Sequence, residues 1–181
     1  MKRTSYFLIK QFDALVYGAF GPFGVLYVFP QFFRTLDKKL HLVFPVSSVQ
    51  DYIGTAFMWA GAALALWCGG IMLRNKSTVS PFSWATKLAR TGPYRIVRHP
   101  MMWAIHLVLI GEIVVWNSPM LVMWFLLWLR LAVLYIDRYE EPHLLSLFGE
   151  QYVDYCKTTP RWIPRLGKIR IAGRRTNEIS G

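Results

Sequence analysis

The feature that most constrains this chain is a set of long runs without charged residues. The clearest run extends from Tyr52 to Leu73 and contains no Asp, Glu, Lys or Arg. It has the length that a helix needs to cross the hydrocarbon core of a bilayer. A backbone in lipid must satisfy its own hydrogen bonds, so such runs predict helices rather than open sheets. The sequence therefore predicts an all-α integral membrane protein.

Three further runs complete a predicted set of about four transmembrane helices. Ala14–Phe33 is uncharged, but its Gly and Pro residues predict an irregular or kinked helix. Met101–Asn117 and Pro119–Ile136 are separated by a tight turn around Ser118, so we expect an antiparallel helical hairpin. Small residues in the clearest run are expected to let another helix approach closely: Gly54, Ala56, Ala60, Gly61, Ala63 and Ala65.

The segments between and after these runs are more polar. Arg34–Asp51 and Arg74–Pro100 are predicted to be connections, and Tyr139–Tyr155 a helix on the membrane surface. Residues 166–181 form a basic tail. A length of 181 residues predicts one domain, covering residues 1–181.

The placement of charge favours a membrane and argues against nucleic acid as a partner. The net charge is +11, but charged residues are only 17% of the chain, below the roughly 25% of soluble domains. Lys and Arg flank the apolar runs, and a nucleic-acid face would need them on a soluble fold. With four spans, the positive-inside rule places both termini and the connection at residues 74–100 in the cytoplasm.

The two cysteines indicate neither a disulfide framework nor a metal site. Cys68 lies within an apolar run and Cys156 in the C-terminal portion. Their separation has no metal-ligand spacing, so we expect two free thiols and no metal.

Functional side chains concentrate between Thr91 and Pro100. Gly92-Pro93 predicts a tight turn, and Pro100 prevents the preceding residues from continuing as regular helix. An apolar run follows directly. This arrangement predicts either a basic loop that binds lipid headgroups or a cofactor pocket at the membrane surface. The side chains concerned are Tyr94, Arg95, Arg98 and His99.

Three ionisable residues lie inside predicted spans, where such groups are costly and often functional. Counted from the turn at Ser118, His106 and Arg130 lie at similar depths of roughly 17 and 19 Å, and Glu112 at roughly 8 Å. We therefore expect His106 and Arg130 to share a polar cavity that opens to the cytoplasmic side. Glu112 is expected to stabilise helix contacts. A purely structural polar role is the alternative for each.

Glu140 and Glu141 are adjacent carboxylates just past a span. Ionised carboxylates accept hydrogen bonds only, so the pair suits an ammonium group or a ribose diol. Alternatively, they are ordinary first-turn residues of a helix. The hairpin is expected to bring them to the same membrane face as Arg98 and His99.

In their order and spacing, these pieces resemble the signature of the integral-membrane methyltransferases typified by isoprenylcysteine carboxyl methyltransferase, with phospholipid methyltransferases as relatives. The matching region covers about residues 84–164. The matching pieces are Gly92-Pro93-Tyr94, Arg98-His99-Pro100, Glu140-Glu141-Pro142, Phe148-Gly149 with Tyr152 and Tyr155, and Pro160-Arg161-Trp162-Ile163-Pro164.

The resemblance implies S-adenosyl-L-methionine as the cofactor, bound at the cytoplasmic membrane face, and a lipophilic small molecule or lipid as the acceptor. It implies that Glu140 takes the cofactor's amino group, while Arg98 fixes the loop or meets the carboxylate. The family usually has a Tyr at the position of Met102. The full set of implied cofactor-binding residues is Thr86, Lys87, Leu88, Ala89, Tyr94, Arg98, His99, Pro100, Met101, Met102 and Glu140.

The acceptor implied by the resemblance is an isoprenylcysteine carboxylate or a phospholipid amine. The family generally has a substrate-orienting Arg at the position of Ile136, and Arg138 or Arg130 is expected to substitute for it. A carboxylate acceptor would need only such a cation. An amine acceptor must lose a proton, with His106 or Glu141 as candidate bases.

Two other function classes remain as alternatives. Membrane sterol or enone reductases have a similar Arg-His-Pro and Tyr-x-x-Tyr…Pro ending, and they usually bind NADPH. They tend to be longer, and Glu140-Glu141-Pro142 favours methyl transfer. The second alternative is a non-enzymatic membrane scaffold whose basic face binds anionic lipid.

Overall fold

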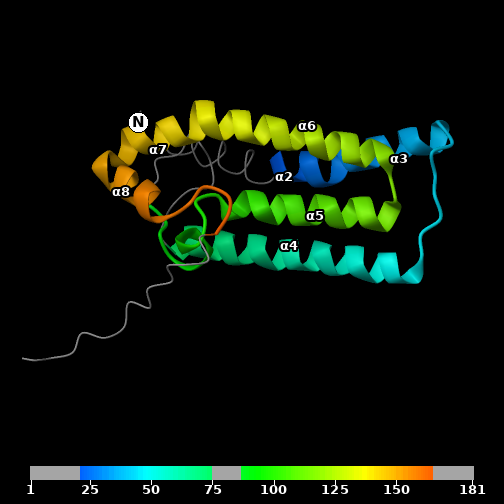
Figure 1. Ribbon diagram of the computed structural model, residues 1–181, viewed down its shortest axis with the longest axis horizontal. Coiled ribbons are helices and arrows are strands. Elements are labelled where there is room, and N and C mark those ends of the chain that lie inside the picture. Colours follow the sequence, from blue (N-terminus) through cyan, green and yellow to red (C-terminus); the bar gives the residue numbers. More distant parts are fainter. Residues whose placement is uncertain (1–20, 75–86, 165–181) are drawn as a thin grey trace, which may run out of the picture.

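The computed structural model describes residues 21–74 and 87–164, and all regular structure in these ranges is helical (Figure 1). The helical prediction is therefore confirmed for this part of the chain. Thr86, residues 14–20 of the predicted first span and the basic tail lie outside the described residues. The elements are α2 Gly21–Phe23, η2 Gly24–Val28, α3 Phe29–Lys39, α4 Ser48–Arg74, η3 Gly92–Arg95, α5 Pro100–Trp116, α6 Pro119–Tyr135, η4 Ile136–Glu140, α7 Glu141–Phe148 and α8 Glu150–Thr158.

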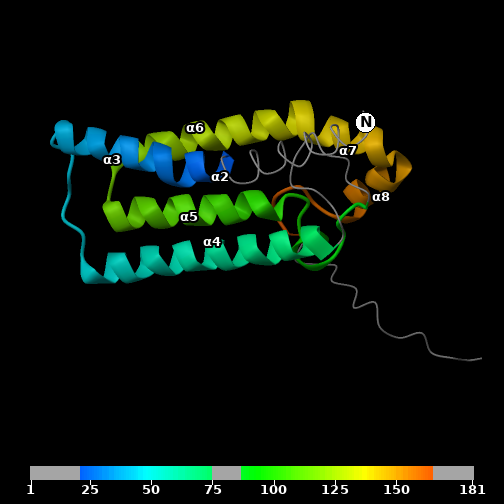
Figure 2. The same cartoon turned by 180° about the vertical axis from the view of Figure 1, so that it is seen from behind.

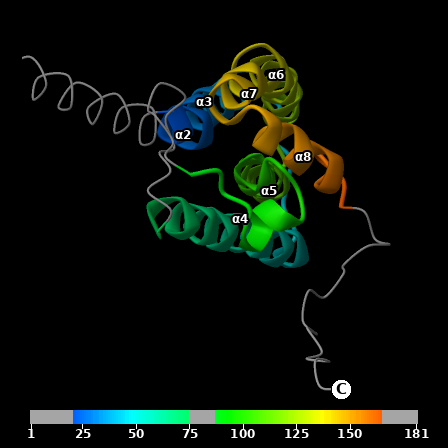
Figure 3. The same ribbon diagram turned by 90° about the vertical axis from the view of Figure 1, so that its left-hand side faces the viewer.

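The long helices lie side by side with α5 in the middle (Figures 1 and 2). Seen end-on, α4 covers one side of α5, while α6 and the α2–α3 segment cover the other (Figure 3). One end of this bundle carries the α5–α6 turn and the connection from α3 to α4. The opposite end carries η3, α7 and α8 (Figure 1).

The contact between α4 and α5 depends on residues without bulky side chains. Gly54, Gly61 and Cys68 recur every seven residues on α4 and are its buried residues. A Cβ on Gly54 would lie 2.7 Å from the carbonyl oxygen of Gly111, and one on Gly61 would lie 2.7 Å from that of Ala104. The predicted close approach is confirmed at these two glycines, whereas Ala56, Ala60 and Ala63 face outward.

The α5–α6 hairpin is confirmed, and its turn is fixed by a buried acid. Asn117 adopts a left-handed conformation with φ of 45°. Ser118 caps α6 by accepting a hydrogen bond from the Leu121 amide at 3.1 Å, and its hydroxyl donates to the carboxylate of Asp37. Asp37 and Ser118 are both buried. The expectation that residues 34–51 form a connection is wrong for residues 34–39, which continue α3 and present Asp37 to this turn, and for residues 48–51, which begin α4.

The other side of α5 packs in an aromatic-rich core with α6 and η2. Val25, Ile105, Leu109, Leu121 and Trp124 form its buried centre. The Trp124 indole donates to the Val25 carbonyl at 3.3 Å, where the π-helical turn of η2 interrupts the regular helix. This turn follows Gly21, Pro22 and Gly24, which is the irregularity that the sequence predicted.

Two of the described helices are long and apolar enough to cross a membrane, judged by length and composition. They are Ser48–Arg74 and the continuous helical run Pro119–Phe148, while Pro100–Trp116 is apolar but shorter. Large apolar side chains such as Trp59, Leu66 and Leu126 point outward from these helices.

The predicted single surface helix Tyr139–Tyr155 is wrong in its bounds. The helix of α6 continues through the π-helical turn η4 into α7, and the chain then breaks at Gly149 before α8. Gly149 has φ of 50°, in the left-handed region that glycine tolerates best. The break turns α8 back toward the start of α5 (Figure 1).

Replacing Gly54 with Ala is expected to destabilise the protein by about 1–3 kcal/mol, because the added methyl group would overlap Val115 and the Gly111 carbonyl. The measurement is reversible unfolding in detergent micelles. Gly69→Ala is the matched control on the same helix, since nothing lies within 4 Å of its Cβ position. Equal stability losses in the two variants would contradict the close helix contact.

Candidate active site

One wall of the candidate site is the loop that leads into α5. Gly92 opens η3 with φ of 58°, and a Cβ there would lie 2.5 Å from the Ile71 side chain of α4. The Arg98 amide donates to the Pro160 carbonyl at 2.9 Å, which ties the loop to the C-terminal segment. Pro100 is the first residue of α5, so His99 stands at its N-terminus. This geometry holds Arg98 and His99 at the end of the bundle.

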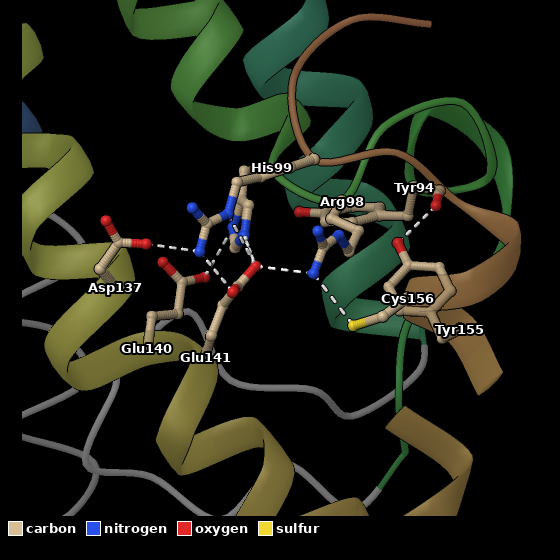
Figure 4. Close-up of polar contacts among 9 residues, drawn as sticks. Tyr94, Arg98, His99, Asp137, Glu140, Glu141, Tyr155 and Cys156 are labelled. Carbon is tan, nitrogen blue, oxygen red and sulfur yellow. Dashed lines mark hydrogen bonds and ion pairs between the residues drawn. The ribbon is translucent and has the colours of Figure 1, made fainter. Parts of the chain in front are cut away.

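The facing wall is the π-helical turn η4 and the start of α7 (Figure 4). A π-helical turn contains more residues than an α-helical turn, and such turns are frequent at functional sites. Here the turn directs Asp137, Glu140 and Glu141 toward the loop (Figure 4). The predicted convergence of the Glu pair with Arg98 and His99 is therefore present in the structure.

His99 lies between the two glutamates. Its Nδ1 is 3.3 Å from Oε1 of Glu140, and its Nε2 is 3.3 Å from Oε1 of Glu141. Burial lowers the pKa of His99, but the hydrogen bonds and charges of Glu140 and Glu141 outweigh it and raise the pKa above its ordinary value. The imidazolium form, which donates from both nitrogens, fits this arrangement.

Glu141 is the carboxylate that the most cations share. Arg98 Nη1 donates to its Oε1 at 2.8 Å, and Arg161 Nε donates to the same oxygen at 3.0 Å. Arg161 Nη2 contacts the other oxygen of Glu141 and lies 2.5 Å from Asp137 Oδ1. With His99 and Glu140 included, three basic groups face three carboxylates.

Glu140 makes fewer ion pairs than Glu141. Its one ion pair among the described residues is with His99, and 31% of its side chain is exposed. Glu141 was also predicted as a candidate base, but its oxygens are held by two guanidinium groups and an imidazole. That arrangement favours an anchoring role for Glu141 and leaves Glu140 available to a ligand.

Two members of the cluster were missed in sequence reasoning, Asp137 and Arg161. Arg161 belongs to the Pro160–Pro164 piece quoted for the resemblance, but that piece was given no role. The sequence did contain a signal for a further cation such as Arg161, because two adjacent carboxylates that are partly shielded from water need more than one cation to balance their charge. Asp137 lies one helical turn before Glu141, which lets one guanidinium reach both carboxylates.

Tyr155 and Cys156 of α8 contact the loop that precedes α5. The Tyr155 hydroxyl donates to the Tyr94 carbonyl at 2.5 Å, and Arg98 Nη1 lies 3.0 Å from the Cys156 sulfur. Burial, followed by the nearby Cys68 and Glu140, raises the pKa of Tyr94 well above its ordinary range. Tyr94 is therefore a neutral hydrogen-bonding phenol at physiological pH.

The other residues of the implied cofactor set divide between this cluster and the helix core. Lys87 and Leu88 lie in the irregular stretch before η3. Ala89 is buried in a small cluster with Cys68 and Tyr94, and Met101 packs against that cluster. Pro100 is buried, whereas Met102 packs against the α5–α6 core.

The predicted cavity shared by His106 and Arg130 is wrong. The His106 ring is buried and contacts Phe125 of α6 edge-on, at a centroid distance of 5.7 Å. Arg130 follows Phe125 by five residues, which places it roughly 140° further around the helix. Arg130 is exposed, as is Arg138 in η4. Residue counting along the two helices does not give the direction in which each side chain points.

Comparison with known proteins gives a family match and one curated relative. The family described as phospholipid methyltransferase matches residues 49–151, more than half of the chain. The nickel-cobalt-cadmium resistance protein NccN of Alcaligenes xylosoxydans xylosoxydans is 33% identical over 107 residues, covering 58% of this chain and 45% of that protein. The chain thus spans less than half the length of that relative. No solved structure matches the chain.

Glu141→Gln is expected to destabilise the protein by about 2–4 kcal/mol, because it leaves Arg98, His99 and Arg161 partly buried without their shared anion. Glu140→Gln is the matched control and should cost less than about 1 kcal/mol, since its single contact is partly exposed. Denaturant unfolding of both variants in detergent gives the comparison. A larger loss in Glu140→Gln would contradict the assigned roles.

Stability should fall as pH rises above neutrality. The folded-state pKa of His99 is raised above the ordinary value of 6.5, so its contribution is fully present below about pH 6.5. That contribution is lost as pH rises through the folded-state pKa. Unfolding free energies measured between pH 6 and 9 should show this decline in the wild type, and a flatter profile in His99→Gln. Parallel profiles would count against a charged His99.

Proposed function

The chain belongs to the phospholipid methyltransferase family, and on this basis we propose that it is an S-adenosyl-L-methionine-dependent methyltransferase that acts on a lipophilic acceptor in a membrane. The observation that supports the proposal best is the convergence of Glu140, Arg98 and His99 at one end of an apolar helix bundle. Family membership supports methyl transfer, and the charged cluster supports a zwitterionic ligand.

The residues present fit the methionine end of this cofactor. Glu140 has a partly exposed carboxylate with a single ion-pair partner among the described residues, suited to an ammonium group. Nε of Arg98 is buried and has no hydrogen-bond partner among the described residues. That donor suits a carboxylate. The carboxylate of Glu140 on one wall and Nε of Arg98 on the other are therefore the groups available to a ligand.

When bound, S-adenosyl-L-methionine supplies a methyl group that its sulfonium already activates. The protein then needs to orient the two reactants and exclude water. Glu141 fixes Arg98, His99 and Arg161 in one arrangement, and Tyr155 fixes the loop through the Tyr94 carbonyl. These contacts make the site rigid before a ligand arrives, which lowers the entropy lost on binding.

The acceptor is proposed to enter from the lipid. Residues 48–74 and 119–148 are the helices suited to a bilayer, and the carboxylates of the cluster belong to the C-terminal part of the second. A lipid could therefore keep its chains beside the bundle while its reactive group reaches the cluster. We further propose a multi-pass topology with both termini and the cofactor site in the cytoplasm, as the distribution of Lys and Arg favours.

Calorimetric titration of the detergent-solubilised protein separates this function from an NADPH-dependent reductase. S-adenosylhomocysteine should bind and NADPH should not. Glu140→Ala should weaken S-adenosylhomocysteine binding by about 10- to 100-fold, the value of one charge-assisted hydrogen bond. Glu150→Ala, an exposed acid on α8, is the control and should bind normally. Unchanged affinity in Glu140→Ala, or binding of NADPH, would overturn the proposal.

A further inference from the structure

His106 lies in a compartment made of aromatic rings. Its ring contacts Trp103 edge-on at 6.2 Å between centroids, Phe125 edge-on at 5.7 Å, and Trp162 at 6.2 Å. Only 5% of the residue is exposed, and its Nε2 has no hydrogen-bond partner among the described residues. A buried imidazole nitrogen without a partner is costly unless a ligand or a proton uses it.

This compartment directly adjoins the charged cluster. The Trp162 ring lies between two imidazoles, with its centroid 5.9 Å from His99 and 6.2 Å from His106. The Trp162 carbonyl accepts a hydrogen bond from the Trp103 indole at 2.9 Å, which holds this segment over the start of α5. His106 follows His99 by seven residues, or roughly 10 Å along the helix. The charged cluster and the aromatic compartment are thus neighbouring parts of one site.

We propose that the compartment formed by Trp103, His106, Phe125 and Trp162 is the acceptor subsite, and that His106 removes the acceptor's proton. The acceptor is therefore a group with a transferable proton on nitrogen or sulfur, and not a carboxylate. This inference rests on the proposed function and specifies which side of the site receives the acceptor.

The surroundings of His106 disfavour a carboxylate acceptor. An anion would need a cation, but Arg161 is engaged by Glu141, the remaining donor of Arg98 is assigned to the carboxylate of the cofactor, and Arg130 is exposed on α6. The faces of aromatic rings carry negative charge, so they repel anions and attract ammonium groups. An amine that becomes more methylated would therefore be stabilised by the same rings.

The reaction is balanced without a metal or a redox partner. The lone pair on Nε2 of His106 takes the proton, and the freed nitrogen or sulfur lone pair forms the bond to the methyl carbon. The bond between methyl carbon and sulfonium sulfur breaks, and its electrons return to sulfur to give S-adenosylhomocysteine. His106 then releases the proton.

Among the rings around His106, Trp103 is the one that forms part of the outer surface. Trp103 lies one helical turn before His106 and is 37% exposed, whereas His106 is not. Trp162 belongs to the irregular segment after α8 and covers His106 from the side of the charged cluster. A lipophilic acceptor can therefore approach from the side of the bundle and place its reactive group next to His106.

The test compares His106→Gln and His106→Phe with the wild type. Both should lose methyl transfer by at least about 100-fold, because neither side chain can take a proton. Gln keeps a hydrogen-bond acceptor and Phe does not. In a cofactor-free titration followed by tryptophan fluorescence, acceptor affinity should therefore weaken more in His106→Phe. Glu112→Gln, a second buried ionisable residue of α5, is the matched control and should leave transfer unchanged.

The acceptor class is tested with methyl-labelled S-adenosyl-L-methionine and three probes: dioleoylphosphatidylethanolamine vesicles, hexadecanethiol and N-acetyl-S-farnesylcysteine. Label is expected in the amine or the thiol, where mild alkali does not release it as methanol because the methyl group is bonded to nitrogen or sulfur. Label in the farnesylcysteine, released by alkali as methanol, identifies a methyl ester and overturns the inference. Undiminished transfer in both His106 variants also overturns it. Loss of S-adenosylhomocysteine binding by the wild type would instead reject the underlying function.

Discussion

The arrangement of the site depends on one shared carboxylate. Glu141 receives Arg98 from the loop before α5, His99 from the N-terminus of α5, and Arg161 from the segment after α8. Arg98 and His99 are neighbours in the chain, whereas Glu141 and Arg161 come from later segments, and the three cations meet on the same anion. A partly buried carboxylate with several cations is stable only as a group, since removing the anion leaves uncompensated charge. The helix bundle supplies the frame, and this ion cluster closes its polar end.

Glu140 and Glu141 differ in role because three basic groups already contact Glu141. Glu141 is held from several sides, while Glu140 has one contact, with His99, and keeps part of its side chain exposed. Glu140 is the last residue of the π-helical turn η4 and Glu141 is the first residue of α7, so the two side chains leave the helix in different directions. One carboxylate can therefore serve structure while its neighbour remains available for a ligand.

The opposite end of the bundle is fixed by a second, smaller polar contact. Asp37 of α3 accepts the Ser118 hydroxyl at the α5–α6 turn, and both residues are buried. Close packing of α4 on α5 through Gly54 and Gly61 holds the bundle between its ends. The loop that carries Arg98 and His99 is thus supported by closely packed helices. The aromatic residues around His106 adjoin this loop through the ring of Trp162.

The sequence by itself determined the helical class, the α5–α6 hairpin and the meeting of Arg98 and His99 with the glutamate pair. Each follows from local or one-dimensional information: uncharged runs, Gly and Pro punctuation, and a hairpin whose ends must come together. Only the tertiary structure decided which way side chains turn. His106 is buried among rings and Arg130 is exposed, because Arg130 lies roughly 140° around α6 from Phe125, the residue that His106 contacts. The roles of Asp37, Asp137 and Arg161 likewise depend on contacts between distant segments, which no local pattern specifies.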